Sequence, residues 1–157
     1  MSRAESTRRP LRLVLDTNVV LDLLVFADSR LAPIAAALAD TRAEWIADGE
    51  ALGELERVLS YPELRLTAAA ASATMARAAA LAKRVATPAE TRVLPRCRDA
   101  DDQKFLVLAV AVGADFLLSR DRAVLTMARR MRSISPALSI VTPEVLSNRL
   151  RSSDGLG

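Results

Sequence analysis

"LRLVLDTNVVLDLL", residues 11–24, places three polar residues between two apolar segments. Residues 11–15 are short and aliphatic, which favours a buried strand, and the pattern from Val19 to Val25 favours a helix. A carboxylate between two buried segments is costly unless it is paired or binds a metal ion. The polar residues, Asp16, Thr17 and Asn18, therefore mark either a strand-to-helix turn or a functional site.

The composition of the chain suits one domain. Its 157 residues are enough to bury a core. Apolar residues make up 51% of the sequence and aromatic residues only 3%, which favours closely packed helices around an aliphatic sheet. The net charge of +3 permits a nucleic-acid partner but does not by itself indicate one.

Several residue types are rare or missing, and this excludes whole classes of chemistry. The chain has no histidine, so Ser-His-Asp catalysis, Cys-His catalysis and histidine zinc sites are excluded. A single cysteine, Cys97, excludes an internal disulfide and a multi-cysteine metal site. No apolar run approaches the ~20 residues of a membrane span, and residues 1–10 lack the apolar core of a signal peptide. We therefore expect a cytoplasmic protein that does not contact membranes.

Short apolar runs alternate with helical patterns along most of the chain. The predicted strands are residues 11–15, 44–47, 91–95, 115–119 and 138–141. The predicted helices are residues 19–25, 32–40, 50–60, 67–86, 103–112, 120–130 and 142–150. This alternation predicts one α/β domain at 11–150 with a mostly parallel sheet, between a disordered arm at 1–10 and a flexible tail at 151–157. No glycine-rich loop follows a strand, which argues against P-loop and dinucleotide-binding folds.

Acidic residues follow the predicted strands. Asp16 ends the first strand, Asp121 lies just beyond the fourth, and Asp102 lies with Asp99 and Asp101 in the turn after the third. In an open parallel sheet, ligands bind outside the carboxyl ends of the strands. Glu54, on the helix after the second strand, could reach the same edge. Without histidine or a set of thiolates, converging carboxylates suit a hard divalent cation, Mg²⁺ or Mn²⁺.

Simpler roles remain open for most of these acids. Asp102 and Asp121 could each serve only as the cap of a helix N-terminus. Glu54 and Glu56 border the apolar stripe of their helix on opposite sides, so periodicity does not choose between them. Two further acids fall away from the functional edge: Asp115 begins its strand, and Asp22 lies along the helix as surface charge.

Four segments together resemble PIN-domain proteins, and the likeness is greatest to the toxin branch found in bacterial toxin–antitoxin pairs. The segments are "LVLDTNVVLDLL", "EALGELERVL", "RDADDQKFLVLAVAVGADFLLSRD" and "IVTPEVL", which span residues 11 to about 147. The resemblance implies a single-domain α/β/α sandwich with a central, mostly parallel sheet. It also implies a metal-dependent ribonuclease.

The resemblance assigns a role to individual residues. It implies that Asp16, Glu54, Asp102 and Asp121 are the catalytic, metal-binding carboxylates, and it selects Glu54 over Glu50 and Glu56. Asn18 and Ser119 fall where the family has polar residues lining the site, with Ser119 in place of the more usual threonine. Asp99 and Asp101 are extra carboxylates that either bind the metal through water or cap the turn.

The resulting expectation is an endoribonuclease that uses Mg²⁺ (or Mn²⁺), acts on RNA, forms a homodimer and is neutralised by a cognate antitoxin protein. The main alternative is a non-catalytic PIN-like domain that binds RNA or a partner. A haloacid-dehalogenase-like phosphatase would have a second aspartate where this chain has Asn18. Arg98, Arg120 and Arg122 either hold substrate phosphates or are solvated surface charge.

Overall fold

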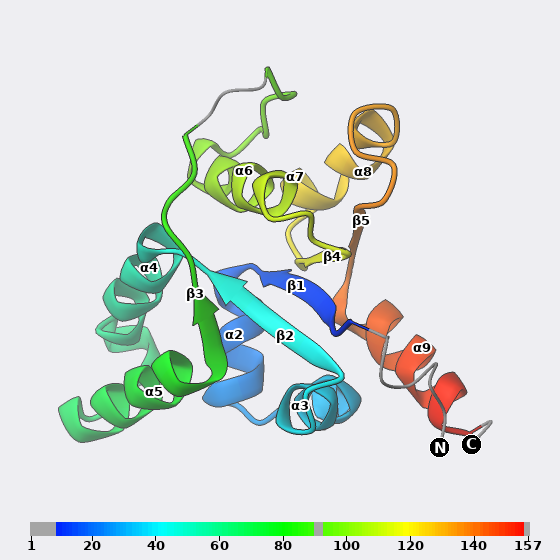
Figure 1. The fold of residues 1–157 in the computed structure, drawn as a ribbon. Coiled ribbons are helices and arrows are strands. Elements are labelled where there is room, and N and C mark those ends of the chain that lie inside the picture. The colour runs from blue at the N-terminus through cyan, green and yellow to red at the C-terminus, as the bar shows by residue number, and fades with distance from the viewer. Residues whose placement is uncertain (1–8, 90–92, 156–157) are drawn as a thin grey trace.

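Five parallel strands form the sheet at the centre of the protein (Figure 1). The structure, a computed structural model, describes residues 9–89 and 93–155. The strands are β1 (Leu11–Leu15), β2 (Ala43–Ala47), β3 (Ala82–Arg84), β4 (Phe116–Leu118) and β5 (Ser139–Val141). Their order across the sheet is β3-β2-β1-β4-β5. The chain therefore places β2 and β3 on one side of β1, and then β4 and β5 on the other side.

Helices cover both faces of this sheet, as the predicted α/β/α sandwich requires. The α-helices are α2 (Thr17–Leu24), α3 (Ala32–Ala39), α4 (Gly49–Leu59), α5 (Ala68–Leu81), α6 (Gln103–Ala111), α7 (Arg122–Leu125), α8 (Met127–Met131) and α9 (Pro143–Gly155). Short 3-10 turns are η1 (Ser29–Leu31), η2 (Pro62–Leu64) and η3 (Ala100–Asp102). The fold class predicted from the sequence is confirmed.

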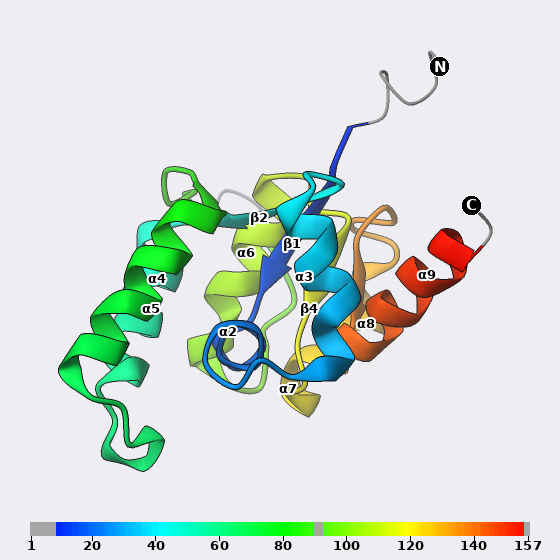
Figure 2. The same ribbon diagram turned by 90° about the horizontal axis from the view of Figure 1, so that it is seen from below.

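Alternating side chains of β1 divide the core into two parts. Leu13 and Leu15 pack with α2, α3, α4, α5 and α9, and Val14 packs with α6, α7 and α8 on the other face. All three side chains are at most 2% exposed, because β1 is the central strand and both of its faces are covered. Figures 1 and 2 show α5 and α9 at opposite sides of the molecule.

Local sequence signals account for several of the element boundaries. The Thr67 side chain accepts a hydrogen bond from the backbone N–H of Ala70 (3.0 Å) and so caps the N-terminus of the long alanine-rich helix α5. Gly113 follows the end of α6 with a φ of 63°, a left-handed conformation that suits glycine after a helix. Helix α4 ends at Leu59, shortly before Pro62.

The prediction of the third strand was wrong. Residues 93–95 are not in a strand, and residues 91 and 92 lie outside the described part of the chain. The third strand is instead β3, residues 82–84, which the sequence placed near the end of a helix spanning 67–86. The helix stops at Leu81 because Ala82 is extended and pairs with Trp45 of β2. This long-range pairing outweighs the helix propensity of the local sequence.

Other boundaries differ in smaller ways. The helix predicted at 120–130 is divided into α7 and α8. Helix α9 continues to Gly155, past the predicted start of the tail at residue 151. The predicted N-terminal arm falls almost wholly on residues 1–8, outside the described ranges. None of the helices within residues 9–89 and 93–155 has the length and apolar character needed to cross a membrane.

Candidate metal centre

The carboxyl ends of β1 and β4 bring two acidic loops side by side. These strands are neighbours, with Leu15 opposite Leu118, and the backbone N–H of Asp16 donates to the carbonyl of Leu118 (3.0 Å). The order of the strands reverses at this place, and such a reversal leaves a crevice in which open α/β sheets bind ligands. The predicted functional edge of the sheet therefore lies at this switch point.

Asp16 serves as a helix cap and as a buried polar group at this switch point. Its Oδ1 accepts a hydrogen bond from the backbone N–H of Asn18 (3.2 Å), which caps α2. Its Oδ2 accepts a hydrogen bond from the hydroxyl of Ser119 (2.6 Å). Asp16 is only 5% exposed, and this burial raises its pKa, with smaller contributions from the charges of Glu54 and Asp121. The two hydrogen bonds oppose the rise and hold the carboxylate in one orientation.

Ser119 connects Asp16 to Asp121. The Ser119 hydroxyl is fully buried, donates to Asp16 and accepts from the backbone N–H of Asp121 (3.0 Å). Asp121 in turn caps α7, because its Oδ1 accepts from the backbone N–H of Ala123 (2.8 Å). The simple cap role considered for Asp121 is therefore present, and it fixes the carboxylate at the carboxyl end of β4.

Asp99 and Asp102 approach Asp121 from the loop before α6. Each of the three aspartates offers a carboxylate oxygen, and these oxygens lie within 4.8 Å of one another. Gln103 anchors the loop, because its side chain accepts from the backbone N–H of Cys97 (2.7 Å) and donates to the carbonyl of Pro95 (3.2 Å). The geometry places Asp99, Asp102 and Asp121 in one group.

Asp102 is the most perturbed acid of the group. Burial, followed by the negative charge of Asp16, a hydrogen bond shared with Asp121 and the charges of Asp121 and Asp99, raises the pKa of Asp102 to about 7. Its Oδ2 is buried and has no hydrogen-bond partner among the described residues. A buried carboxylate oxygen surrounded by other carboxylates is poorly satisfied without a cation.

These distances suit a hard divalent cation. Mg²⁺ and Ca²⁺ bind oxygen ligands at roughly 2.0–2.6 Å, so oxygens bound to one such ion lie no more than about 5 Å apart. The three aspartate oxygens meet that limit. The donor set is all oxygen, which matches the preference of Mg²⁺ and Mn²⁺. The acidic cluster is compatible with metal binding.

The PIN domain family matches residues 12–123 of the chain. This chain belongs to the PIN domain family. No curated protein matches it at a significant level. The matched residues carry all four acids that the resemblance singled out, while β5 and α9 lie beyond the match and complete one side of the sheet.

Glu54 of this PIN domain lies near the cluster but outside the closest group of three. Its Oε2 accepts a hydrogen bond from the Thr17 hydroxyl, and its Oε1 accepts from the ammonium of Lys104 at 2.5 Å. Glu50 and Glu56, the neighbours that periodicity could not separate from it, are exposed. Glu54 is thus the acid of α4 that faces the loop after β1.

Sequence reasoning missed Lys104 and Thr17. Lys104 carried one weak signal, since it lies one helical turn after Asp101 at the start of α6. Thr17 carried another, because it is the middle residue of the polar stretch that follows β1. Neither signal predicts that both residues bond to Glu54 on α4.

The remaining candidates are either exposed or bonded to another part of the fold. The Asn18 side chain is exposed, and Asp101, Arg98 and Arg122 are exposed as well. Arg120 neither points to solvent nor joins the acidic cluster, because it bonds to Asp22 (2.9 Å) and to Glu144. The prediction that Asp22 is surface charge was therefore wrong, since its position along α2 did not reveal a partner on another element.

Proposed function

We propose that this PIN domain is a ribonuclease that hydrolyses phosphodiester bonds of RNA with Mg²⁺ or Mn²⁺. The observation that carries the proposal is the group Asp99, Asp102 and Asp121, whose oxygens converge while the buried Oδ2 of Asp102 has no hydrogen-bond partner among the described residues. Family membership supports it, because PIN domains are generally metal-dependent nucleases.

The proposed site contains Asp16, Glu54, Asp102 and Asp121, and Asp99 adds a fifth carboxylate. Asp99, Asp102 and Asp121 would hold the cation, and Asp16 and Glu54 would face it from the loop after β1 and from α4. When bound, the cation would activate water and offset the charge that develops on the phosphate. Ser119 and the N–H of Asn18 orient Asp16, so its charge is fixed before substrate arrives.

Metal binding at the proposed site would depend on the protonation state of Asp102. Its pKa of about 7 means that a large share of the carboxyl is protonated at neutral pH without metal. Carboxylate ligands bind a cation in the deprotonated form, so metal binding would release this proton. We therefore propose that metal affinity rises with pH through the neutral range.

We further propose that the protein is the toxin of a toxin–antitoxin pair. Its motifs, above all "LVLDTNVVLDLL" and "RDADDQKFLVLAVAVGADFLLSRD", resemble that branch of PIN domains. This assignment would make the protein a cytoplasmic endoribonuclease, a homodimer and the target of an antitoxin protein. The competing proposal is a non-catalytic domain that binds RNA or a partner, but all four acidic positions are filled, which favours retained chemistry.

Cleavage of RNA by purified protein tests the proposal. Linear single-stranded, structured and circular RNAs are incubated with Mn²⁺ or with EDTA, and cleavage of the circular RNA identifies an endonuclease. Wild type is expected to cleave only with Mn²⁺. Asp16→Asn keeps a side chain that can cap α2 and should lose at least about a hundredfold in rate, since even outer-shell changes at metal sites cost 10–100-fold.

Asp22→Asn is the matched control, because it removes a carboxylate of α2 that bonds to Arg120 instead of facing the cluster. It should cleave at close to the wild-type rate. Cleavage that survives EDTA, or that is equal in Asp16→Asn and wild type, would overturn the proposed function.

A further inference from the structure

Lys104 places a positive charge beside the acidic cluster. It begins on the first turn of α6, and its ammonium donates to Glu54 Oε1 on α4 (2.5 Å) and to the backbone carbonyl of Asp101. The same ammonium lies 4.9 Å from the centre of the Phe105 ring. These contacts hold the charge at the boundary between α4, α6 and the loop that carries Asp102.

The Lys104–Glu54 pair is, together with the pairs of Arg120, among the least exposed ion pairs of the described residues. Its two side chains are only 18% and 19% exposed. In the pairs formed by Arg9, Arg30 and Lys83 the cationic side chain is 55–62% exposed. A pair held away from solvent keeps a defined position and is screened less than a surface pair.

The ammonium retains a free donor. A lysine ammonium has three N–H groups. Glu54 and the Asp101 carbonyl accept two of them, and no other acceptor within residues 9–89 and 93–155 takes the third. The residue is therefore anchored through two bonds while one N–H is left for another acceptor.

A cavity of about 270 Å³ opens next to Lys104. The residues that line it include Asp48, Glu50, Thr87, Arg96, Gln103 and Lys104. Gln103 and Lys104, which both line the cavity, are the two residues that follow Asp102 in the chain. The cavity offers space for a polar group of a ligand next to Lys104.

The negative charge of the site disfavours binding of a phosphate. Five carboxylates, Asp16, Glu54, Asp99, Asp102 and Asp121, would repel a phosphate, and one divalent cation offsets only part of their charge. Lys104 adds a fixed positive charge on the side of Glu54. An ammonium with a spare N–H in a confined site is a suitable partner for a phosphate oxygen.

We propose that Lys104 binds a backbone phosphate of single-stranded RNA beside the metal centre, with Glu54 as the residue that positions its ammonium. This inference rests on the proposed function, because it takes RNA as the ligand. It makes Glu54 a positioning residue for Lys104 in addition to a negative charge of the site.

The dependence of RNA binding on salt tests this contact. Affinity for a fluorescent single-stranded RNA is measured by anisotropy with Mn²⁺ over a series of NaCl concentrations, in the Asp16→Asn background so that the RNA stays intact. Each phosphate contact contributes about 0.7 to the slope of log affinity against log salt for single strands. Lys104→Met should reduce the slope by about this amount and weaken binding roughly tenfold. The weakening should be the same for oligo-U and oligo-A, because a phosphate contact does not read bases.

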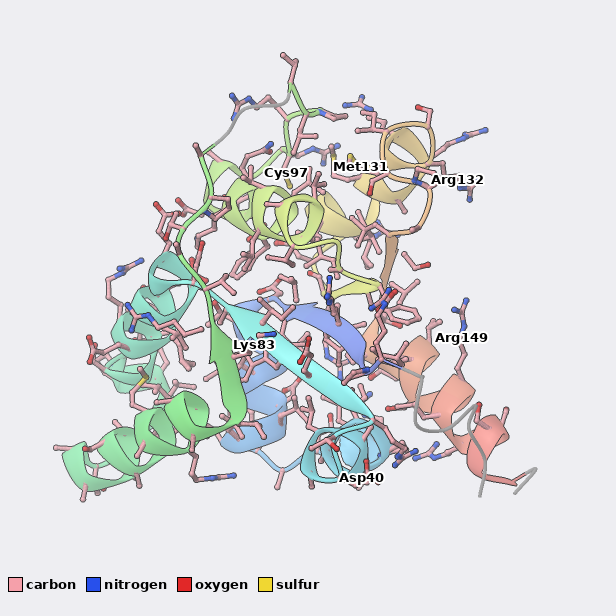
Figure 3. The ribbon with its side chains drawn as sticks, viewed as in Figure 1. Asp40, Lys83, Cys97, Met131, Arg132 and Arg149 are labelled. Carbon is pink, nitrogen blue, oxygen red and sulfur yellow. The ribbon has the colours of Figure 1, made fainter. Side chains whose placement is uncertain are left out.

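The chain offers a matched control, since Lys83 is its only other lysine. Lys83 lies on the edge strand β3 and is 61% exposed (Figure 3). Lys83→Met should leave the slope unchanged. Lys104→Arg should restore the slope, whereas a purely structural Lys104 would alter the melting temperature and leave the slope as it is.

The outcomes separate this inference from the proposed function. An unchanged slope in Lys104→Met, an equal loss in Lys83→Met, unequal losses with the two oligonucleotides, or no RNA binding at all would each overturn it. Metal-dependent cleavage by wild type together with an unchanged slope would overturn the role of Lys104 alone. RNA binding with the expected slope change but without cleavage would leave Lys104 as a phosphate-binding residue and reject the nuclease.

Discussion

Two groups of acids lie on either side of the loop after β4, and adjacent residues of that loop join different groups. Asp121 joins Asp99 and Asp102, whereas Arg120 bonds to Asp22 and Glu144. Asp28 and Arg30 extend the second group, with Arg30 bonded to Asp28 at 2.7 Å. Both groups contain carboxylates, and in the second group Arg120 and Arg30 bond to them.

The pKa values of Asp28 and Glu144 in the second group shift in the opposite direction to that of Asp102 in the first. Hydrogen bonds from Arg30, first from its side chain and then from its backbone, lower the pKa of Asp28 to about 2. Although partial burial opposes it, Arg120 lowers the pKa of Glu144. Burial and neighbouring carboxylates instead raise the pKa of Asp102 to about 7. The group with arginine is neutralised within the protein, whereas Asp102 of the other group keeps a raised pKa.

The largest expected difference concerns stabilisation by metal. Mn²⁺ at about 100 times its dissociation constant should stabilise wild type by roughly 2.7 kcal/mol, because it binds only the folded state. Asp121→Asn keeps a side chain that can cap α7 and should lose most of this gain. Asp22→Asn, a substitution in the neutralised group, should keep the full gain in stability from Mn²⁺. Differential scanning fluorimetry with Mn²⁺ and with EDTA measures both, and an equal rise in melting temperature for Asp121→Asn and wild type would contradict the metal centre.

A smaller difference should appear when arginine is removed from the second group. Arg120→Gln leaves Asp22 and Glu144 without their shared cation, and we expect it to lower the free energy of unfolding by about 1–3 kcal/mol. Arg30→Gln is the control, since the Arg30 side chain is 62% exposed and its removal should destabilise the protein less than removal of Arg120. Urea denaturation in EDTA measures both losses. Equal losses would show that the Arg120 contacts are no stronger than a surface pair.

The smallest expected effect is a dependence of stability on pH in the metal-free protein. The pKa of Asp102 is about 7 in the folded state and about 4 in an unfolded chain, so between these values the folded state binds more protons. The contribution of Asp102 to the free energy of unfolding therefore falls as pH rises from about 4 to about 7. Asp102→Asn should remove this fall, which we expect to be near 1 kcal/mol because the group is partly exposed to solvent.

The neutralised group provides the contrast for that experiment. The pKa of Asp28 is lowered to about 2, so the stability that it contributes is present above about pH 4 and is lost as pH falls toward 2. The contribution of Asp28 to stability is therefore constant from about pH 5 to about pH 8. Urea midpoints measured in EDTA over this range report on the acidic cluster alone. A wild-type protein whose stability has the same pH dependence as that of Asp102→Asn over this range would contradict the raised pKa.

Local sequence determined much of the fold. The strand at 11–15, the turn at Asp16 and the helix that follows could all be read from one stretch, because aliphatic runs and helix caps depend on neighbouring residues. The alternation of strands and helices likewise predicted the parallel α/β sheet. The strand at 82–84 could not be read in this way, since it forms only because β2 lies beside it.

The same distinction holds for the candidate site. Strand ends alone placed Asp16 and Asp121 at one edge of the sheet, because parallel strands share the direction of their carboxyl ends. Tertiary structure decided the partners: it grouped Asp99 with Asp102 and Asp121, and it joined Glu54 to Lys104 across 50 residues of chain. Burial and distance in space determine whether a carboxylate meets a cation, and periodicity along the chain carries information about neither. The sequence by itself therefore determined that Asp16 and Asp121 reach the same edge of the sheet, and only the fold decided which carboxylates of the described residues bond to a cationic side chain.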